Sequence, residues 1–286
     1  MTQDKLLHAT HCQQRRIRPS SGPPRRARQR RLGVTLVELL IASTVMALII
    51  GALATMATGL RTQQECSQQY TLAMMHARTA LSRIEQNCRA AYANAKFPGF
   101  VAFAELVGTD SYPDCLVIWR PQGNPAKPTG LPLWNEVVIY GWNPNKPNEL
   151  LEIRVPNDSS PVPDLTQVSA WLSRLAALRA GTGSSRVVVT DRLRVAQPRS
   201  APGNLRGVIR FEAVLQPSDT QWTSWKAGQL AWTDMSWPRD LYGLSYGVRQ
   251  NLCRVELQIR PAGSDDPQSA FVFFGSAYLY YPVSPQ

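Results

Sequence analysis

The longest apolar stretch of the chain runs from Val34 to about Leu60 and ends at Arg61. Within it the only other residues are Gly, Ser, Thr and a single acid, Glu38. A helix needs about 20 predominantly apolar residues to cross a bilayer. Residues 34–60 are therefore predicted to form a transmembrane helix.

A second pattern begins after Arg61 and predicts that the helix continues as an amphipathic half over residues 61–95. The helix is expected to end near Ala95, before Pro98-Gly99. A coiled-coil seam is the alternative, but the pattern covers only about three heptads and lacks paired charges. We expect this side of the helix to pack on a sheet. Its apolar residues recur at spacings of four and three and are Tyr70, Met74, Ala77, Leu81, Ile84, Cys88 and Ala91.

Short alternating runs, separated by Pro, Gly and Asn, follow Gly99 and predict β-strands. The clearest alternation lies at residues 253–259, where Cys253, Val255, Leu257 and Ile259 are expected to face the core. The predicted strands cover residues 115–119, 137–141, 150–155, 186–194, 207–216, 248–260 and 270–280. Residues 121–132 and 142–148 are expected to form extended loops.

One helix is predicted among these strands. Asp164 is its expected N-cap, with Gln167 three residues later, and Gly181 suits its end. The residues expected on its apolar face are Leu165, Val168, Leu172 and Leu175. Together, the patterns predict an α+β fold, with a long N-terminal helix packed on a mainly antiparallel β-sheet head over residues 96–286.

Residues 1–33 hold most of the basic charge. This segment has nine Lys or Arg residues against Asp4, so it supplies eight of the formal net charge of +11. The cluster from Arg25 to Arg31 is expected to stay in the cytoplasm, so the chain after Arg61 should be exported. The remaining net charge of +3 comes from basic residues that are scattered along the chain. The net charge therefore does not support a nucleic-acid-binding protein. DNA binding stays only as a remote alternative.

Glu38 requires an explanation that a plain membrane anchor does not give. An acid inside a hydrocarbon span costs roughly 2.5–3.5 kcal/mol on insertion scales. A cation at the same depth would offset this cost, and a cut between Gly33 and Val34 would create one as a free α-amine. Cleavage at this site and the acid at Glu38 therefore explain each other.

These residues resemble the prepilin-type cleavage and methylation signal of type IV pilins and of the pseudopilins of type II secretion. Gly33 matches the residue before the cut, Val34 the new N-terminus and Glu38 the acid at the fifth mature position. The resemblance covers about 25 residues. It is specific, because a Gly, an acid and a membrane span stand at fixed distances from one another. It departs from the family at Val34, where Phe or Met is usual, and in the length of the leader.

The resemblance implies a structural role and no enzymatic activity. A membrane prepilin peptidase would remove residues 1–33 and methylate the amine of Val34. The subunit would cross the bacterial inner membrane once, with a cytoplasmic leader and a periplasmic head, and then enter a filament. Its expected partners are this peptidase, other major and minor pilins or pseudopilins, and the inner-membrane assembly platform. Glu38 would pair with the N-terminal amine of a neighbouring subunit.

The size and layout of the mature chain resemble those of minor subunits placed near a filament tip. The similarity is to the J-type minor pseudopilins of type II secretion or to the W-type minor pilins. Glu38 argues against the K-type tip protein, which lacks this acid in the family.

Two simpler interpretations compete with cleavage at Gly33. The first is an uncleaved signal anchor, and the second is a secretory signal peptide cut after Ala52-Leu53-Ala54. Neither uses Gly33 or Glu38.

Four cysteines lie in the exported part, where disulfides are permitted. Cys66 and Cys88 cannot pair on one helix, because 22 residues place them about 33 Å apart. We expect a disulfide between two of Cys88, Cys115 and Cys253. Buried free thiols are the alternative.

The sequence offers little for catalysis or metal binding. His76 is the only histidine after the leader, and we expect it to be solvated. There is no zinc spacing, phosphate loop or nucleophile elbow. Asp265-Asp266 could bind calcium, although a solvated turn is the stronger interpretation, so no cofactor is expected.

An aromatic segment lies at residues 221–246, where the strand signals are weak. It contains Trp222, Trp225, Trp232 and Trp237, which could form an interface with a partner or a glycan. The alternative function for the whole chain is therefore a membrane-anchored extracytoplasmic binding module that uses this Trp-rich loop. Burial of the rings over the core is the simpler interpretation.

Overall fold

The computed structural model describes residues 33–235, 247–261 and 269–282. The chain divides into two compact units, one ending at Thr58 and the other beginning at Gly59. We call residues 33–58 the N-terminal unit and the described residues from Gly59 onward the head, and we treat each by itself.

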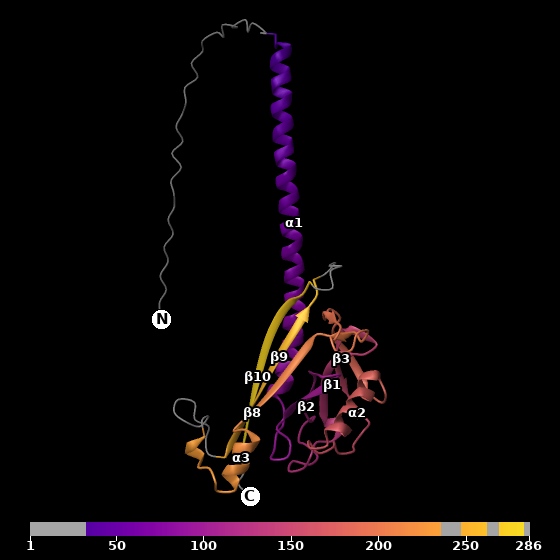
Figure 1. Ribbon diagram of the computed structural model, residues 1–286, viewed down its shortest axis with the longest axis vertical. Helices are drawn as coiled ribbons and strands as arrows, with labels where there is room; N and C mark the ends of the chain where they lie inside the picture. The colour runs from indigo at the N-terminus through magenta and orange to yellow at the C-terminus, as the bar shows by residue number, and fades with distance from the viewer. Residues whose placement is uncertain (1–32, 236–246, 262–268, 283–286) are drawn as a thin grey trace, which may run out of the picture. The chain divides into compact units, whose positions relative to one another are not determined.

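The helix α1 spans Leu36–Arg89 (Figure 1). Its part in the N-terminal unit exposes apolar side chains on all sides, with Leu36 80% and Leu48 75% exposed. A helix that is apolar all round needs a membrane or a protein bundle to cover it. Among the described residues, α1 is long and apolar enough to cross a membrane.

The end of α1 differs from the prediction, because the helix stops at Arg89 and not near Ala95. The backbone of Tyr92 instead donates to the carbonyl of Trp119 at 2.9 Å, at the end of a strand. The Asn94 side chain then accepts hydrogen bonds from the backbone amides of Lys96 and Phe97, at 2.8 and 2.9 Å. These tertiary and turn bonds replace the helical bonds of the last predicted turn.

The head contains a five-stranded sheet in the order β1-β2-β3-β4-β5, a three-stranded sheet in the order β10-β9-β8, and the short pair β6-β7. Every strand pair is antiparallel, so the predicted α+β fold with a long N-terminal helix and antiparallel sheets is confirmed. The strands are β1 (Phe100–Val107), β2 (Asp110–Trp119), β3 (Val137–Asn143), β4 (Lys146–Arg154), β5 (Ser185–Thr190), β6 (Val195–Ala196), β7 (Arg206–Gly207), β8 (Ile209–Gln216), β9 (Val248–Ile259) and β10 (Phe271–Pro282). The shorter helical elements are α2 (Val168–Ala180), α3 (Asp219–Lys226), and the 3-10 turns η1 (Trp134–Glu136) and η2 (Trp232–Asp234).

Each predicted strand overlaps an observed one, although β5 ends at Thr190 and not at Arg194. The short strand β6 and the longer strand β1 were not predicted. The register of β1 shifts between Phe103 and Glu105, so its sequence does not alternate strictly. The predicted loop at residues 142–148 is wrong, because Asn143 ends β3 and Lys146 begins β4 in a tight hairpin. Residues 121–132 contain no helix or strand, as expected for a loop.

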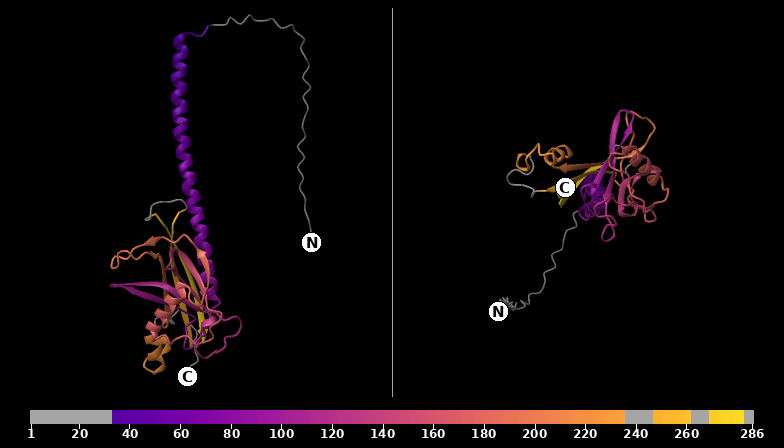
Figure 2. Two further views of the ribbon diagram at one scale, coloured as in Figure 1. Left: turned by 90° about the vertical axis from the view of Figure 1, so that its right-hand side faces the viewer. Right: turned by 90° about the horizontal axis from the view of Figure 1, so that it is seen from below.

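The five-stranded sheet separates two hydrophobic cores. The first lies between α1, one face of this sheet and the three-stranded sheet, and the second lies between the opposite face and α2. In β2, for example, Leu116 and Ile118 belong to the first core, whereas Cys115 and Val117 belong to the second. Figures 1 and 2 show α2 and α3 on opposite sides of the head.

The head part of α1 buries one side of the helix, as the periodicity predicts, although Tyr70, expected on the same side, is 43% exposed. Ala77, Leu81, Ile84 and Cys88 are all less than a tenth exposed. The buried face also contains Ala73, Ala80 and Asn87. Small residues along this face let the helix backbone approach the sheet closely.

The predicted helix near Asp164 exists, but its start and its buried face are different. Gln167 is the N-cap of α2, and the Asp164 carboxylate instead accepts from the backbone amide of Thr166 at 3.0 Å. Val168 is 48% exposed, whereas Trp171 is completely buried and stacks on Phe103 at 4.8 Å. The large indole therefore sets the buried face. Gly181 ends the helix with φ of 106°, as predicted.

Candidate functional site

The residues of the predicted processing signal lie at the start of the N-terminal unit. Gly33 and Val34 precede the helix, and Val34 is 71% exposed. A Cβ placed on Gly33 would meet no atom within 4 Å. The fold therefore gives no steric reason for glycine at this position, and a requirement for it must come from outside the chain.

Glu38 lies in the first turn of α1 and forms a capping box with Thr35. The backbone amide of Thr35 donates to the Glu38 carboxylate at 3.0 Å, and the amide of Glu38 donates to the Thr35 hydroxyl at 3.3 Å. This reciprocal pair satisfies two amides that a helix start leaves free. The sequence pattern Thr-x-x-Glu could have revealed it, and it gives Glu38 a local role that the charge argument overlooked.

The other polar side chains of the N-terminal unit are satisfied within the helix. The hydroxyls of Ser43 and Thr44 donate to the carbonyl of Leu40, at 2.9 and 3.1 Å. The hydroxyl of Thr55 donates to the carbonyl of Ala52 at 2.8 Å. Such bonds make hydroxyls tolerable in lipid. Residues 34–60 contain no Lys or Arg, so Glu38 has no opposite charge within this stretch.

In the head, a hydrogen-bonded network fixes α1 to the five-stranded sheet. The Arg83 guanidinium donates to the Glu152 carboxylate at 2.6 Å, and the Tyr140 hydroxyl donates to the same oxygen at 2.7 Å. Asn87 donates to the Tyr140 hydroxyl. Burial disfavours the ionised form of Glu152, but hydrogen bonds from Arg83, Tyr140 and Arg154 outweigh it and lower the pKa of Glu152 to about 2. A charged, fully paired carboxylate thus holds helix and sheet together.

The four described cysteines are free thiols, and three of them are buried. Cys88 of α1 and Cys253 of β9 belong to the first core, and Cys115 of β2 belongs to the second. Cys66 is exposed. Thus the structure brings together two of the three cysteines proposed for a disulfide.

The tryptophans of the predicted interface pack on one another. Trp222 lies in α3, and its ring centroid is 4.7 Å from that of Trp225 and 6.3 Å from that of Trp232. Trp222 and Trp232 are only 7% and 9% exposed and share a small core with Met235 and Tyr281. This burial leaves these two rings little surface for a partner. Trp237 lies outside the described residues.

The helix α3 was missed by the sequence analysis. Ser218 accepts from the amide of Gln221 at 3.2 Å, and the Gln221 side chain accepts from the amide of Ser218 at 3.1 Å. This capping box is visible in the sequence as Ser-x-x-Gln and could have indicated the helix.

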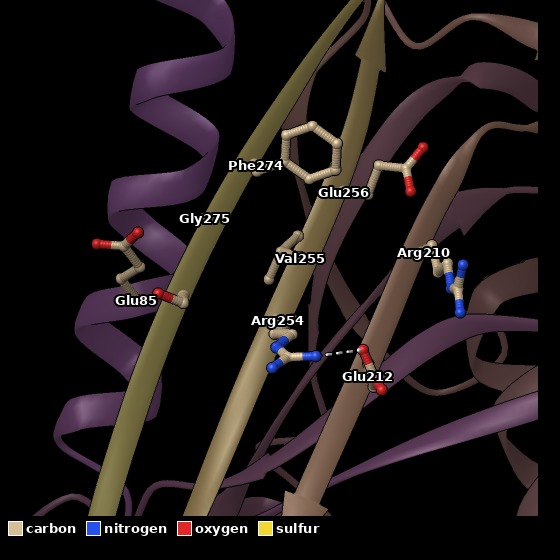
Figure 3. Close-up of a pocket in the computed structure, with 9 residues that line it drawn as sticks. Glu85, Arg210, Glu212, Arg254, Val255, Glu256, Phe274 and Gly275 are labelled. Carbon is tan, nitrogen blue, oxygen red and sulfur yellow. Dashed lines mark hydrogen bonds and ion pairs between the residues drawn. The ribbon is translucent and has the colours of Figure 1, made fainter.

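The three-stranded sheet has an open face on the side away from α1, shown in Figure 3. Arg254 of β9 pairs with Glu212 of β8 at 3.5 Å, and Phe274 of β10 is 74% exposed. The neighbouring Gly275 lets α1 approach β10 closely, because a Cβ at this position would lie 2.9 Å from Leu81 Cδ2 and 3.0 Å from Glu85 Oε1. These residues, apart from Leu81, line a cavity of about 580 Å³. Two of its charged side chains, Arg254 and Glu212, pair with each other, and we assign this cavity no ligand.

Metal binding has no support within the residues that the structure describes. No group of three or more His, Cys, Asp or Glu side chains there could hold an ion. Asp265 and Asp266, considered for calcium, lie outside the described residues. His76 is half-buried, and its ring nitrogen lies 3.5 Å from the Thr190 hydroxyl.

The comparison with protein families identifies the N-terminal segment. Residues 28–54 match the prokaryotic N-terminal methylation motif. Among curated proteins and solved structures, nothing matches this chain. The match includes Gly33, Val34 and Glu38, and the motif is that of prepilin peptidase substrates. The chain therefore carries the prepilin-type signal found in type IV pilin-like proteins and, within the described residues, one apolar helix suited to a membrane anchor and a head of antiparallel sheets.

Proposed function

We propose that this chain is a minor subunit of a pilin-like filament, either a type II secretion pseudopilus or a type IV pilus. It would support protein secretion or pilus assembly. The observation that carries this proposal is the methylation motif at residues 28–54, placed at the start of a helix that is apolar on all sides. The role is structural, and the helix is the part that assembles.

The first step of this proposal is cleavage between Gly33 and Val34, followed by N-methylation of Val34. Both residues are exposed and lie before α1 in neither a helix nor a strand, where a peptidase can reach the backbone. A Cβ on Gly33 would have free space in the fold, which supports the proposal that the peptidase, and not the fold, requires glycine at this position. Residues 1–33 stay in the cytoplasm and are removed, while the head lies in the periplasm.

The second step is assembly through residues 34–60. In a filament, these apolar surfaces would pack against those of neighbouring subunits and leave water and lipid. Glu38 would then pair with the new N-terminal amine of a neighbour. A carboxylate in such a low-dielectric setting is strongly destabilising without a partner, so the pair would fix the register between subunits.

The capping box changes how Glu38 must be tested. Glutamine can replace glutamate in a capping box, but it carries no charge. Glu38→Gln therefore removes the proposed ion pair while it keeps the cap, and Thr35→Val removes the hydroxyl of the cap while it keeps the charge. Glu38→Val removes both features.

The test is incorporation of these variants into filaments in cells that contain the peptidase and the other subunits. We expect all three variants to be processed. Glu38→Gln and Glu38→Val should be lost from sheared filaments, and Thr35→Val should be retained. Normal incorporation of Glu38→Gln, with loss of Thr35→Val, would show that Glu38 acts only as a cap.

The proposal that this chain is a minor subunit near the filament tip is based on the elements that the head contains. Besides the sheets, the head contains α2, α3 and the loop at residues 121–132. These additions favour a J-type pseudopilin or a W-type pilin near the filament tip, in contact with other minor subunits and the assembly platform. The ratio of this chain to the major subunit in purified filaments tests this position, and a ratio near one would contradict it.

A further inference from the structure

Cys88 and Cys253 are brought together from distant parts of the chain. Cys88 lies in the last turn of α1, and Cys253 lies in β9, where it is paired with Ala213 of β8 and Ala277 of β10. Both cysteines are completely buried in the first core. They belong to the same core, and the thiol of Cys253 is the neighbouring group that most perturbs the thiol of Cys88. The small alanine side chains on both sides leave room beside Cys253.

The other two described cysteines cannot take part in this pair. Cys115 alternates with Leu116, so it points to the opposite face of the five-stranded sheet, into the second core. The sheet itself separates it from Cys88 and Cys253. Cys66 is exposed and lies 22 residues before Cys88 on the same helix, about 33 Å away.

We propose that Cys88 and Cys253 form a disulfide in the exported protein. The inference goes beyond subunit assembly, but it rests on the proposed periplasmic location of the head, because an oxidising compartment is needed. The two thiols lose their protons, and an Sγ–Sγ bond forms between them. Two electrons pass to a disulfide of a periplasmic oxidant, which is reduced to two thiols and takes up the protons.

The surroundings of the pair place this reaction before the completion of folding. The neighbouring thiol of Cys253 and burial raise the pKa of Cys88, so little thiolate is present in the folded head. With both sulfurs inaccessible, an external oxidant cannot reach them. The bond must therefore form before α1 has packed on the sheet. Reductants should not open it in the folded protein.

The disulfide would tie the end of the assembly helix to the C-terminal sheet. The loop that it closes runs from Cys88 to Cys253 and contains the whole five-stranded sheet. Closing so long a loop restricts the unfolded chain strongly. A pull on α1 during extraction from the membrane would then reach the three-stranded sheet through a covalent bond.

The direct test is peptide mapping of the full chain isolated from membranes, with free thiols alkylated under denaturing conditions before digestion. Trypsin places Cys88 in peptide 84–89, Cys253 in peptide 250–254, Cys115 in peptide 97–154 and Cys66 in peptide 62–78, because it does not cut at Arg120, Lys127 or Lys146, which precede proline. We expect peptides 84–89 and 250–254 to be linked, and the other two to be alkylated. Alkylation of both Cys88 and Cys253, or a link from either to Cys115, would overturn the proposal.

Cys66 provides an independent readout of topology. In spheroplasts, a membrane-impermeant maleimide should label this exposed cysteine if the head is periplasmic. If Cys66 is labelled while Cys88 and Cys253 are alkylated as free thiols, the disulfide is refuted and the periplasmic location of the head is retained. Absence of labelling at Cys66 would refute the periplasmic location, and free thiols at Cys88 and Cys253 in that protein would refute the disulfide as well.

Thermal unfolding of single and double variants gives a second test. If the bond exists, Cys88→Ala, Cys253→Ala and the double variant should lower the midpoint by nearly the same amount, because each breaks it. Reductant should lower the midpoint of the wild type and of the control Cys115→Ala, and should leave the double variant unchanged. Two results would contradict the bond. The decreases in midpoint of the two single variants would add up in the double variant, and reductant would not change the midpoint of the wild type.

Discussion

Arg83 of α1 donates from its Nε to an Oε of Glu152 in β4 at 2.6 Å, and this bond joins the helix to the five-stranded sheet. The Glu152 side chain is only 3% exposed, whereas that of Arg83 is 43% exposed. The carboxylate is therefore the member that depends most on its partner. Arg154 also contacts Glu152, at 3.1 Å, so the acid is held from two directions.

Arg83→Met should destabilise the head by about 2 kcal/mol, because it removes a hydrogen bond to a buried charge. Chemical denaturation of the purified chain measures this change. Arg78→Met is the matched control, since Arg78 is an exposed arginine on the same helix, and its effect should stay within about 0.5 kcal/mol. Equal effects of the two substitutions would contradict the anchoring role of Arg83.

Acid should weaken the head through Glu152. Its pKa is about 2 in the folded protein, below the value of about 4.3 for an unperturbed Glu. A lowered folded-state pKa stabilises the protein above the unfolded pKa, and this contribution is lost as the pH falls from about 4.3 to about 2. The difference in unfolding free energy between the wild type and Glu152→Gln should shrink across this window. A constant difference would contradict the assignment.

A group of four charges, three of them buried, holds β7 to the five-stranded sheet. Arg206 of β7 contacts Glu105 at 2.9 Å and Asp114 at 2.5 Å, and Arg179 of α2 contacts the same Glu105 at 3.1 Å. Arg206→Met should cost about 3 kcal/mol, because Asp114 and Glu105 then share one arginine in a buried site. Arg210→Met, at an exposed position four residues later, is the control. A loss below about 1 kcal/mol for Arg206→Met would contradict a dependence of these acids on Arg206.

Gly33→Lys should block processing without affecting the head. No atom of the structure lies within 4 Å of a Cβ at this position, so the substitution causes no steric strain in the fold. Immunoblots should show only the unprocessed chain, while the midpoint of head unfolding stays unchanged. Gly51→Ala, at a helical glycine with similar free space, should be processed normally. Processing of Gly33→Lys at the wild-type rate would contradict cleavage at this site.

The sequence was sufficient for the features that depend on local periodicity. Alternation in β9 placed Cys253, Val255 and Leu257 in the core, and the structure confirms their burial. The spacing of Ala77, Leu81 and Ile84 identified the buried face of α1 in the same way. Both elements pack one face on a single core, so their patterns are regular.

Features that depend on tertiary contacts were beyond the reach of the sequence. The helix stops at Arg89 because Tyr92 bonds to the end of β2, which is distant along the chain. Cys115 was a candidate for the predicted disulfide, and it is buried, but the sheet has a core on each side and the alternation cannot say which core a residue enters. The bulge after Phe103 hid β1 for a similar reason, because it breaks the period of two.

The measurement that most directly tests the proposed function is mass spectrometry of the N-terminus of the chain isolated from membranes. The account predicts that residues 1–33 are absent and that the first residue is Val34, heavier by one methyl group on its amine. Two results would contradict it. A chain that retains residues 1–33 would be an uncleaved anchor, and a chain that begins at Thr55 would be a conventional secreted protein.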